Sequence, residues 1–314
     1  MLIKLGVSNY KAILDPVEFS LIATSEQQHV ERLYPVKKFQ KRFLPAAIMF
    51  GGNASGKSSF VQAIHFMRSM VLHENTSPLN YLKQNATLPE QEALHSTFEV
   101  DLLLDDLIYN YQFSCTRKKI VEERLTKSNS RSEYVLFHRR GEEIDFPDVK
   151  MNDVERQRRH FLAESLRDDK LFLYHSIDMK LDDYQAVYDW FEKSLVIIGP
   201  QSRFVGSQIY TAERILDLYN KFLPFIDAGI ERLELETISR EKIEIDDEIL
   251  KEIRSSAPKG KEFSLLLPFG NNFILMTVKD NGNPEFSRLI SIHKNKNAEE
   301  FKLPISEESD GTIR

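Results

Sequence analysis

A short glycine-rich pattern constrains this chain more than any other feature of its sequence. Residues 51–58 (GGNASGKS) satisfy G-x-x-x-x-G-K-[ST]. Such glycines let successive backbone N–H groups turn inward around phosphate oxygens, and a following helix directs its positive end at the same anion. Lys57 would reach the β- and γ-phosphates, and the Ser58 hydroxyl would bind Mg²⁺. The pattern predicts a nucleotide-phosphate site made of Gly51, Gly52, Asn53, Ala54, Ser55, Gly56, Lys57, Ser58 and Ser59.

The flanking residues predict the strand and the helix that such a loop joins. Ala46–Phe50 (AAIMF) is an unbroken apolar run, which is typical of a strand buried on both faces. After the loop, Phe60, Ile64, Met67 and Val71 recur at helical spacing, which predicts one face of a helix. A glycine turn with a purely structural role is the alternative, and the strand–loop–helix context argues against it.

Strand patterns dominate the rest of the first 150 residues. Apolar residues open the chain at Leu2–Leu5 and return over 17–23 (VEFSLIA). From 97 to 125 apolar and polar residues alternate, and Asp105-Asp106 interrupts the alternation, which predicts a hairpin. A further strand is expected over 134–138. We assign residues 1–150 to the N-terminal part of a nucleotide-binding domain.

The middle and the end of the chain differ in pattern. Residues 151–260 are rich in charge and poor in glycine, and Ile215, Leu218, Phe222 and Ile226 recur at three- and four-residue steps, so a helical insertion is predicted. The segment 255–261 (SSAPKGK) has the composition of a linker. Strand patterns return over 263–267, 272–279 and 288–293, so residues 261–314 are predicted to rejoin the nucleotide-binding domain.

Composition excludes several classes of protein. The single cysteine, Cys115, rules out an internal disulfide and a cysteine-based zinc site. No apolar run approaches the ~20 residues that cross a bilayer, and no export pattern opens the chain, so a cytoplasmic protein without a membrane partner is expected. A net charge of −6 argues against a protein that binds nucleic acid through its overall charge. Local contact with nucleic acid stays open if basic clusters converge on one face: Lys37-Lys38 with Lys41-Arg42, Arg117-Lys118-Lys119, Arg139-Arg140, and Arg156 with Arg158-Arg159.

Several segments, in order, resemble one group of ATPases. The loop reads Gly-x-Asn-Ala-Ser-Gly-Lys-Ser-Ser and resembles that of ABC-type ATPases in the SMC/RecF branch. Asn9-Tyr10-Lys11 resembles the N-[FY]-[KR] that begins RecF-like and OLD-like ATPases. Residues 308–312 (ESDGT) resemble the signature segment of the bacterial AAA15/AAA21 group. The I-x-x-E-x-L of Ile120–Leu125 and the D-x-G-I of Asp227–Ile230 fit the same order.

The resemblance implies a fold and a composite site. The fold would be an α/β P-loop NTPase of ABC/SMC type, whose mixed sheet carries an N-terminal antiparallel β-subdomain and an inserted helical subdomain. Such ATPases hold Mg-ATP between two subunits packed head to tail, with the loop of one facing the signature of the other. Ser309, Asp310, Gly311 and Thr312 would then contact the γ-phosphate across the interface. An ordinary Ser-Asp-Gly turn is the alternative for this segment.

Hydrolysis also needs carboxylates for the Mg²⁺ shell and for the attacking water. The resemblance places this Walker B strand downstream of the signature, so we expect the native product to be longer than 314 residues, and no catalytic residue is assigned. Leu102–Asp106 (LLLDD) imitates the pattern, but its place between alternating strands predicts a hairpin turn. Glu244–Glu248 (EIDDE) follows charged residues and is interpreted as a solvated face.

The family order places a Q-loop after a strand near Leu171–Tyr174. His175 stands there and is the candidate contact to Mg²⁺-bound water. A lone histidine at the end of a strand is more often structural, so both interpretations stay open. Cys115 is interpreted as a buried small hydrophobic residue.

The resemblance to phage-defence ATPases of Septu, retron-associated and OLD-type systems gives the leading functional hypothesis. The chain would be an ATP-binding subunit and ATPase, with ATP and Mg²⁺ as cofactors, that dimerises head to tail and controls a nuclease or other toxic effector. One alternative is a RecF-like DNA repair ATPase. Another is a regulatory or scaffold module that binds ATP without hydrolysing it.

Overall fold

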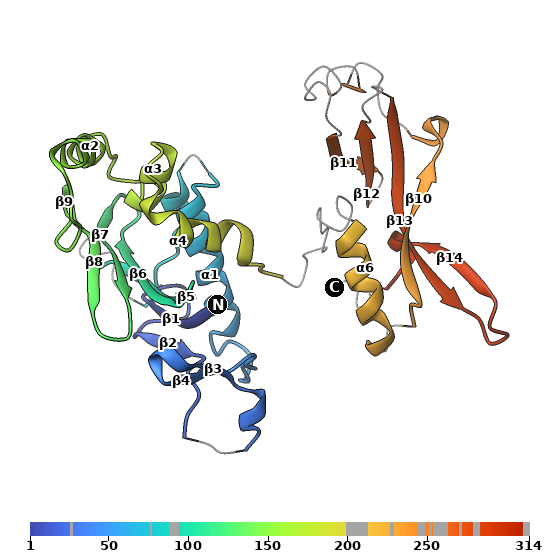
Figure 1. Ribbon diagram of the computed structural model, residues 1–314, viewed down its shortest axis with the longest axis horizontal. Helices are drawn as coiled ribbons and strands as arrows, with labels where there is room; N and C mark the ends of the chain where they lie inside the picture. Colours follow the sequence, from blue (N-terminus) through green and yellow to red (C-terminus); the bar gives the residue numbers. More distant parts are fainter. Residues whose placement is uncertain are drawn as a thin grey trace. The chain divides into compact units, whose positions relative to one another are not determined.

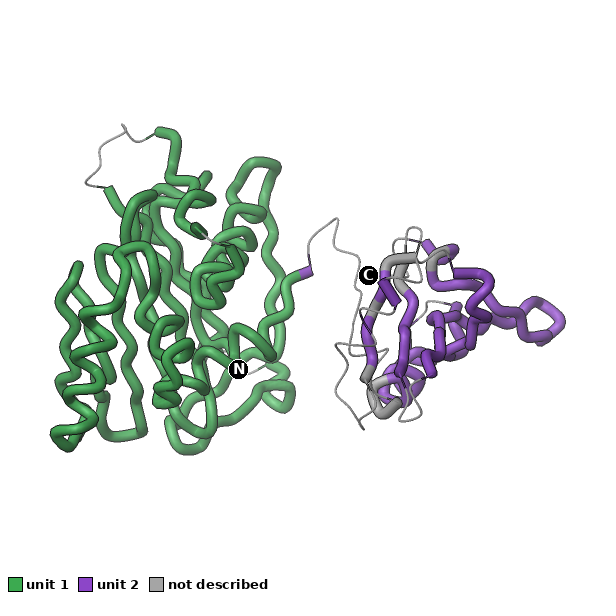
Figure 2. Tube along the Cα trace, turned by 90° about the horizontal axis from the view of Figure 1, so that it is seen from above, with its two compact units in different colours: residues 1–197 green, residues 198–314 purple. Residues whose placement is uncertain are grey.

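The computed structural model describes residues 1–25, 28–75, 77–87, 94–198, 213–226, 229–243, 249–250, 253, 263–269, 272–278 and 283–309. The chain forms two compact units, Met1–Ile197 and Ile198–Arg314 (Figure 2), and each is described by itself. The boundary between the units differs from the predicted domain limits at 150/151 and 260/261. Within the described ranges, no helix combines the length and the apolar character needed to cross a membrane.

The first unit is built on a seven-stranded sheet (Figure 1). Its strands follow the order β2-β1-β5-β6-β7-β8-β9. Their bounds are β1 Leu2–Ser8, β2 Val17–Ser20, β5 Ser96–Leu104, β6 Leu107–Cys115, β7 Ile120–Ser128, β8 Glu133–Arg140 and β9 Glu143–Asp145. Two short strands, β3 Tyr34–Val36 and β4 Lys41–Phe43, form a separate pair. The antiparallel N-terminal sheet was predicted, whereas the parallel pairs of a mixed sheet do not occur among the described strands.

The helices of the first unit are α1 Lys57–Leu72, α2 Asp153–Glu164, α3 Phe172–Asp178 and α4 Gln185–Asp189, with a π-helical turn at Trp190–Ser194. One core joins residues of α1, α3 and α4 to the inward-facing residues of β5 and β6. At its centre, Phe98 of β5 lies between Phe66 of α1 and Phe113 of β6, each ring centroid at 5.1 Å. Cys115 is fully buried there, as the sequence predicted. The core therefore fixes α1 against the sheet.

The predicted hairpin is confirmed. β5 and β6 pair from Ser96↔Cys115 to Leu104↔Leu107, and Asp105-Asp106 form the two-residue turn. Both aspartates have positive φ (47° and 59°), as a type I′ turn requires. Leu102–Asp106 is thus the end of the antiparallel strand β5 and its hairpin turn, as the sequence predicted.

The second unit contains helix α6 Glu213–Phe222 and an antiparallel sheet. The strands are β10 Arg232–Ile238, β11 Phe263–Phe269, β12 Asn272–Val278, β13 Pro284–Lys294 and β14 Glu300–Pro304. Their order is β10-β13-β12-β11, and β14 also pairs with β13. The predicted strands over 263–267, 272–279 and 288–293 are confirmed. Residues 151–260 are not helical throughout, because β10 lies within them and pairs along β13. The linker 255–261 and Glu244–Glu248 lie outside the described residues.

Helix α6 was predicted, but the face that it buries differs from the predicted apolar face, which contains Leu218 and Phe222. Leu216, Tyr219 and Leu223 pack against the sheet, whereas Leu218 and Phe222 are exposed. The Asn220 side chain fixes this orientation, because its amide donates to Leu233 O at 3.0 Å and its oxygen accepts from Leu233 N at 2.7 Å. Both sides of α6 are apolar in sequence, so only the sheet decides which side is covered.

Candidate phosphate-binding site

The predicted loop 51–58 folds as a tight turn that leads directly into α1. Helix α1 begins at Lys57, with Gly56 as its N-cap at φ 93°, in the left-handed region that favours glycine. At Gly51 a Cβ would lie 2.6 Å from Ser55 Oγ, so a side chain cannot be accommodated without movement of Ser55. The two glycines therefore allow the backbone to curl closely on itself.

Lys57 lies across this loop. Its ammonium donates to Gly51 O at 2.7 Å and Gly52 O at 2.6 Å, and it lies 3.4 Å from Ser55 Oγ. No carboxylate among the described residues forms an ion pair with it. The first backbone N–H of α1 with an intrahelical partner is that of Phe60, which donates to Gly56 O at 2.9 Å, so the N–H groups before it have no such partner. A cation and unpaired N–H groups around one turn fit the phosphates of a nucleotide.

Each predicted loop residue has a defined place. Gly51 to Ser55 and Ser58 are exposed, and Ser58 stands in the first turn of α1, where its hydroxyl could join the shell of a phosphate-bound Mg²⁺. Ser59 faces the other way: its Oγ accepts from Ala12 N at 3.4 Å. We find no cluster of three or more His, Cys, Asp or Glu in the described ranges that could hold a metal ion without a nucleotide. Mg²⁺ would therefore depend on phosphate oxygens.

The Asn9-Tyr10-Lys11 segment forms a turn beside this end of α1. Tyr10 and Ile13 exchange backbone hydrogen bonds, and the buried Tyr10 hydroxyl donates to Gln62 O at 3.3 Å. Lys11 Nζ donates to the Gln62 side chain at 2.5 Å. Buried Asn9 accepts from Asn85 N at 3.0 Å. The motif that resembles N-[FY]-[KR] thus braces the first two turns of α1.

Ala46–Phe50 is not the buried strand that the sequence predicted. The segment is assigned to no strand, and Ile48 and Phe50 are 78% and 86% exposed. The last backbone bond before it is Leu44 N to Leu21 O at 2.7 Å. A strand buried on both faces needs ladder neighbours and covering layers. None of the described segments supplies them here, so the apolar composition alone was misleading.

Of the predicted signature residues, Ser309 lies in the second unit and is exposed. Asp310, Gly311 and Thr312 lie outside the described residues. The preceding Glu308 contacts His293 Nε2 at 2.5 Å, and His293 Nδ1 lies 2.8 Å from Gly229 O. His293 therefore joins Gly229 of the D-x-G-I pattern to Glu308, the first residue of the predicted signature segment. No sequence pattern indicates this role of His293, because β13 and Gly229 are brought together only by the sheet.

The Q-loop prediction is wrong in its local structure. Leu171 is the N-cap of helix α3 and Phe172–Tyr174 begin that helix, so no strand precedes His175. The His175 side chain is buried, and its Nε2 lies 3.0 Å from Ser165 Oγ. This hydrogen bond supports the structural interpretation of His175.

Acidification is expected to destabilise the first unit partly through His175. Burial lowers the pKa of His175, and the nearby charge of Lys170 lowers it further. An unfolded histidine titrates near its usual pKa of about 6.5. The unfolded chain therefore binds more protons between the two values, and stability falls as the pH drops below about 6.5. When the pH is lowered from about 7.5 to about 5.5, the melting temperature of His175→Gln should fall less than that of the wild type.

The matched control is His65→Gln, which makes the same change at an exposed histidine of α1. Burial also lowers the pKa of His73, so part of the acid sensitivity should persist in His175→Gln. Identical pH profiles for wild type and His175→Gln would contradict the assignment.

A buried carboxylate that the sequence analysis did not single out organises the first unit. Glu123 of β7 is fully buried and accepts from Phe172 N at 2.6 Å, Leu173 N at 3.0 Å and Tyr111 Oη at 2.9 Å. It caps α3 from a different element. Buried Arg139 lies 4.0 Å away and donates to Lys170 O at 2.6 Å. Burial raises the pKa of Glu123, and Arg139 and the three donors oppose that rise. Glu123 lies two residues before the apolar Leu125, and residues two apart in a strand share a face. This spacing could have indicated that the Glu123 carboxylate points into the core.

The basic clusters do not all present free cations. Arg139 is buried beside Glu123, and Arg159 is buried with its Nη2 donating to Asp183 at 2.8 Å. Arg158 donates to Lys180 O at 2.6 Å, and Lys38 donates to Asp106 O at 2.7 Å. These side chains serve the fold, so the charge pattern alone does not indicate a nucleic-acid surface.

Comparison with known proteins bears on the loop and on both units. The model of the family described as "AAA domain, putative AbiEii toxin, Type IV TA system" matches residues 46–314. No curated protein matches the chain. The matched range contains the phosphate loop and α1. The chain therefore belongs to this AAA-domain family of P-loop ATPases.

Proposed function

We propose that this chain is an ATPase subunit that binds Mg-ATP at residues 51–59. The observation that carries the proposal is the Lys57 ammonium, held between two loop carbonyls at the N-terminus of α1. There it would replace those carbonyls by β- and γ-phosphate oxygens, while the helix N–H groups bind the same anion. Bound Mg²⁺ would offset phosphate charge during transfer to water.

We further propose that ATP brings two copies together head to tail. The segment that ends at Ser309 would approach the γ-phosphate on the loop of the second copy. Two features support this: Ser309 is exposed, and the Glu308–His293 contact holds the residues before it against β13. Donors supplied by a second copy would make ATP favour the closed pair over the open one.

The readout of that closed state would be a nuclease or other toxic effector in anti-phage defence. The family description names a toxin and a type IV toxin–antitoxin system, which supports an effector role of this kind over DNA repair. The buried positions of Arg139 and Arg159 likewise give the DNA-repair alternative little support.

Self-association tests the proposal. In sedimentation velocity with Mg²⁺ and the slowly hydrolysed analogue ATPγS, the wild type should shift from monomer to dimer. Ser309→Arg should remain monomeric, because a bulky cation cannot fit where the serine meets the second loop. Its affinity for ATP as a monomer should stay near wild type, because the loop is untouched.

Ser132→Arg is the matched control, since it makes the same change at an exposed turn of the first unit. It should dimerise as the wild type does. Dimerisation of Ser309→Arg at wild-type ATPγS concentrations would refute the head-to-tail assignment. Release of phosphate by the 314-residue chain would separate an ATPase from a module that only binds ATP.

A further inference from the structure

The first unit contains a pocket whose lining shares no residue with the loop 51–59. It has a volume of about 310 Å³ and is lined by Tyr109, Lys127, Tyr134, Leu136, Asp148, Val149, Lys150, Arg159, Asp183 and Tyr184. None of these residues belongs to the loop or to α1. The strand register creates one wall, because Tyr109 pairs with Lys127 and Lys127 pairs with Tyr134 across β6, β7 and β8. This row places a lysine between two tyrosines.

The lining includes two buried polar side chains, Arg159 and Tyr184, and Arg159 donates to Asp183 at 2.8 Å. Arg159 and Tyr184 are 5% and 2% exposed. Neither Arg159 Nε nor Tyr184 Oη forms a hydrogen bond with a described residue. The Arg159 guanidinium lies close enough to Tyr184 to oppose the rise in its pKa that burial causes, so the two side chains lie beside each other in the wall of the pocket. Burial raises the pKa of Tyr184 to about 12, which keeps its hydroxyl protonated and able to donate.

The charge around the pocket favours an anion. The lining carries three cations and two carboxylates, and both carboxylates are engaged: Asp148 accepts from Val135 N at 2.7 Å and Asp183 accepts from Arg159 at 2.8 Å. By contrast, the ammonium groups of Lys127 and Lys150 have no ion pair or hydrogen bond with a described residue. Three cations against two carboxylates leave the lining with a net charge of +1, which favours an anion over a cation.

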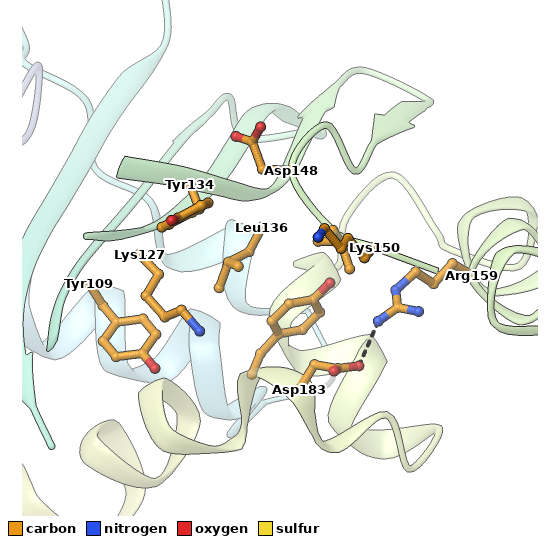
Figure 3. Close-up of a pocket in the computed structure, with 10 residues that line it drawn as sticks. Tyr109, Lys127, Tyr134, Leu136, Asp148, Lys150, Arg159 and Asp183 are labelled. Atoms are coloured by element: carbon orange, nitrogen blue, oxygen red, sulfur yellow. Dashed lines mark hydrogen bonds and ion pairs between the residues drawn. The ribbon is translucent and has the colours of Figure 1, made fainter. Parts of the chain in front are cut away.

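The aromatic and cationic groups are separated along the pocket. Figure 3 shows Tyr109 and Tyr134 at one end, Lys150 and Arg159 toward the other, and the Lys127 ammonium between them. Tyrosine rings offer flat apolar faces on which a base can stack, and arginine and lysine bind phosphate oxygens. The volume lies at the small end of ligand sites, which span roughly 300–1,000 Å³.

We propose that this pocket binds a nucleoside monophosphate, with its base against Tyr109 and Tyr134 and its phosphate held by Lys127, Lys150 and Arg159. The chain thus has a nucleotide site besides its phosphate loop. A nucleoside monophosphate has no γ-phosphate to hydrolyse, so this site suits a regulatory role rather than ATP hydrolysis.

Calorimetric titration of the full chain with AMP, adenosine and inorganic phosphate tests the proposal. The titrations use Lys57→Ala as background, so that the phosphate loop contributes little. AMP should bind with one-to-one stoichiometry and at least roughly tenfold more tightly than adenosine or phosphate, because only AMP engages both ends. Lys127→Met and Lys150→Met should each weaken AMP binding about tenfold, through the loss of one charge-assisted contact.

Lys119→Met is the matched control, because Lys119 is exposed at the opposite end of the β6–β7 hairpin. It should bind AMP as the background does. Lys150 is also exposed, so Lys150→Met keeps the fold, which the fluorescence of Trp190 can verify. The proposal is overturned if AMP does not bind, if neither lysine variant weakens it, or if phosphate alone binds as tightly as AMP.

Discussion

Lys57→Ala is expected to weaken the binding of Mg-ATP about 10- to 100-fold. The Lys57 ammonium is held by Gly51 O and Gly52 O and faces no carboxylate among the described residues, so its charge is available to phosphate. A hydrogen bond to a charged group contributes about 1.5–3 kcal/mol, and each 1.4 kcal/mol changes affinity about tenfold. Calorimetry with Mg-ATP at fixed salt measures the change. Phosphate release should fall at least as far, because phosphate charge develops further during the reaction.

The control for this experiment is Lys119→Ala, which removes the same charge from an exposed turn and should leave ATP affinity unchanged. Lys57→Ala also removes two hydrogen bonds within the loop, so its fold should be verified by the fluorescence of Trp190, the single tryptophan of the chain. Wild-type affinity in a folded Lys57→Ala protein would refute residues 51–59 as the ATP site.

Glu123→Gln is expected to destabilise the first unit by about 3–5 kcal/mol, the usual cost of removing one partner from a buried ion pair. The substitution leaves the Arg139 guanidinium buried without its carboxylate. It also turns an amide NH₂ toward donors, because Phe172 N and Leu173 N each need an acceptor. Urea unfolding followed by Trp190 fluorescence measures the effect, since Trp190 packs in the same core.

Two comparisons make this result specific. Glu122→Gln changes the neighbouring carboxylate, which is 44% exposed and contacts His138, and should cost less than about 1 kcal/mol. Adding Arg139→Met to Glu123→Gln should restore part of the loss, because the unpaired charge is then removed. If Glu123→Gln unfolded at the same urea concentration as Glu122→Gln, the buried pair would not stabilise α3.

Several elements could be predicted because their signals are local. Alternating residues on either side of Asp105-Asp106 specified the β5–β6 hairpin, and both aspartates adopt the φ that the turn needs. The glycine-rich loop and the helical spacing after it specified α1. Each of these signals spans fewer than about twenty residues, and the chain satisfies it without help from distant segments.

The errors fall where neighbours decide the outcome. Ala46–Phe50 has the composition of a buried strand, but a strand exists only when another pairs with it, and Phe50 is largely exposed. Phe172–Tyr174 is apolar enough for a strand, yet Glu123 accepts from the first N–H groups of α3 and stabilises a helix there. Short apolar runs do not distinguish these states.

Adjacent residues specify the glycine-rich loop, the helix after it and most strands, because backbone geometry and periodicity are local properties. Which polar groups are buried, and what they contact, depends instead on the tertiary structure. Glu123 reaches the N–H of Phe172 across 49 positions of the chain. The pocket of the first unit likewise arises because the strand register aligns Tyr109, Lys127 and Tyr134 on three strands. Such contacts depend on how distant segments pack, and packing rather than local sequence sets the burial and the charge of each site.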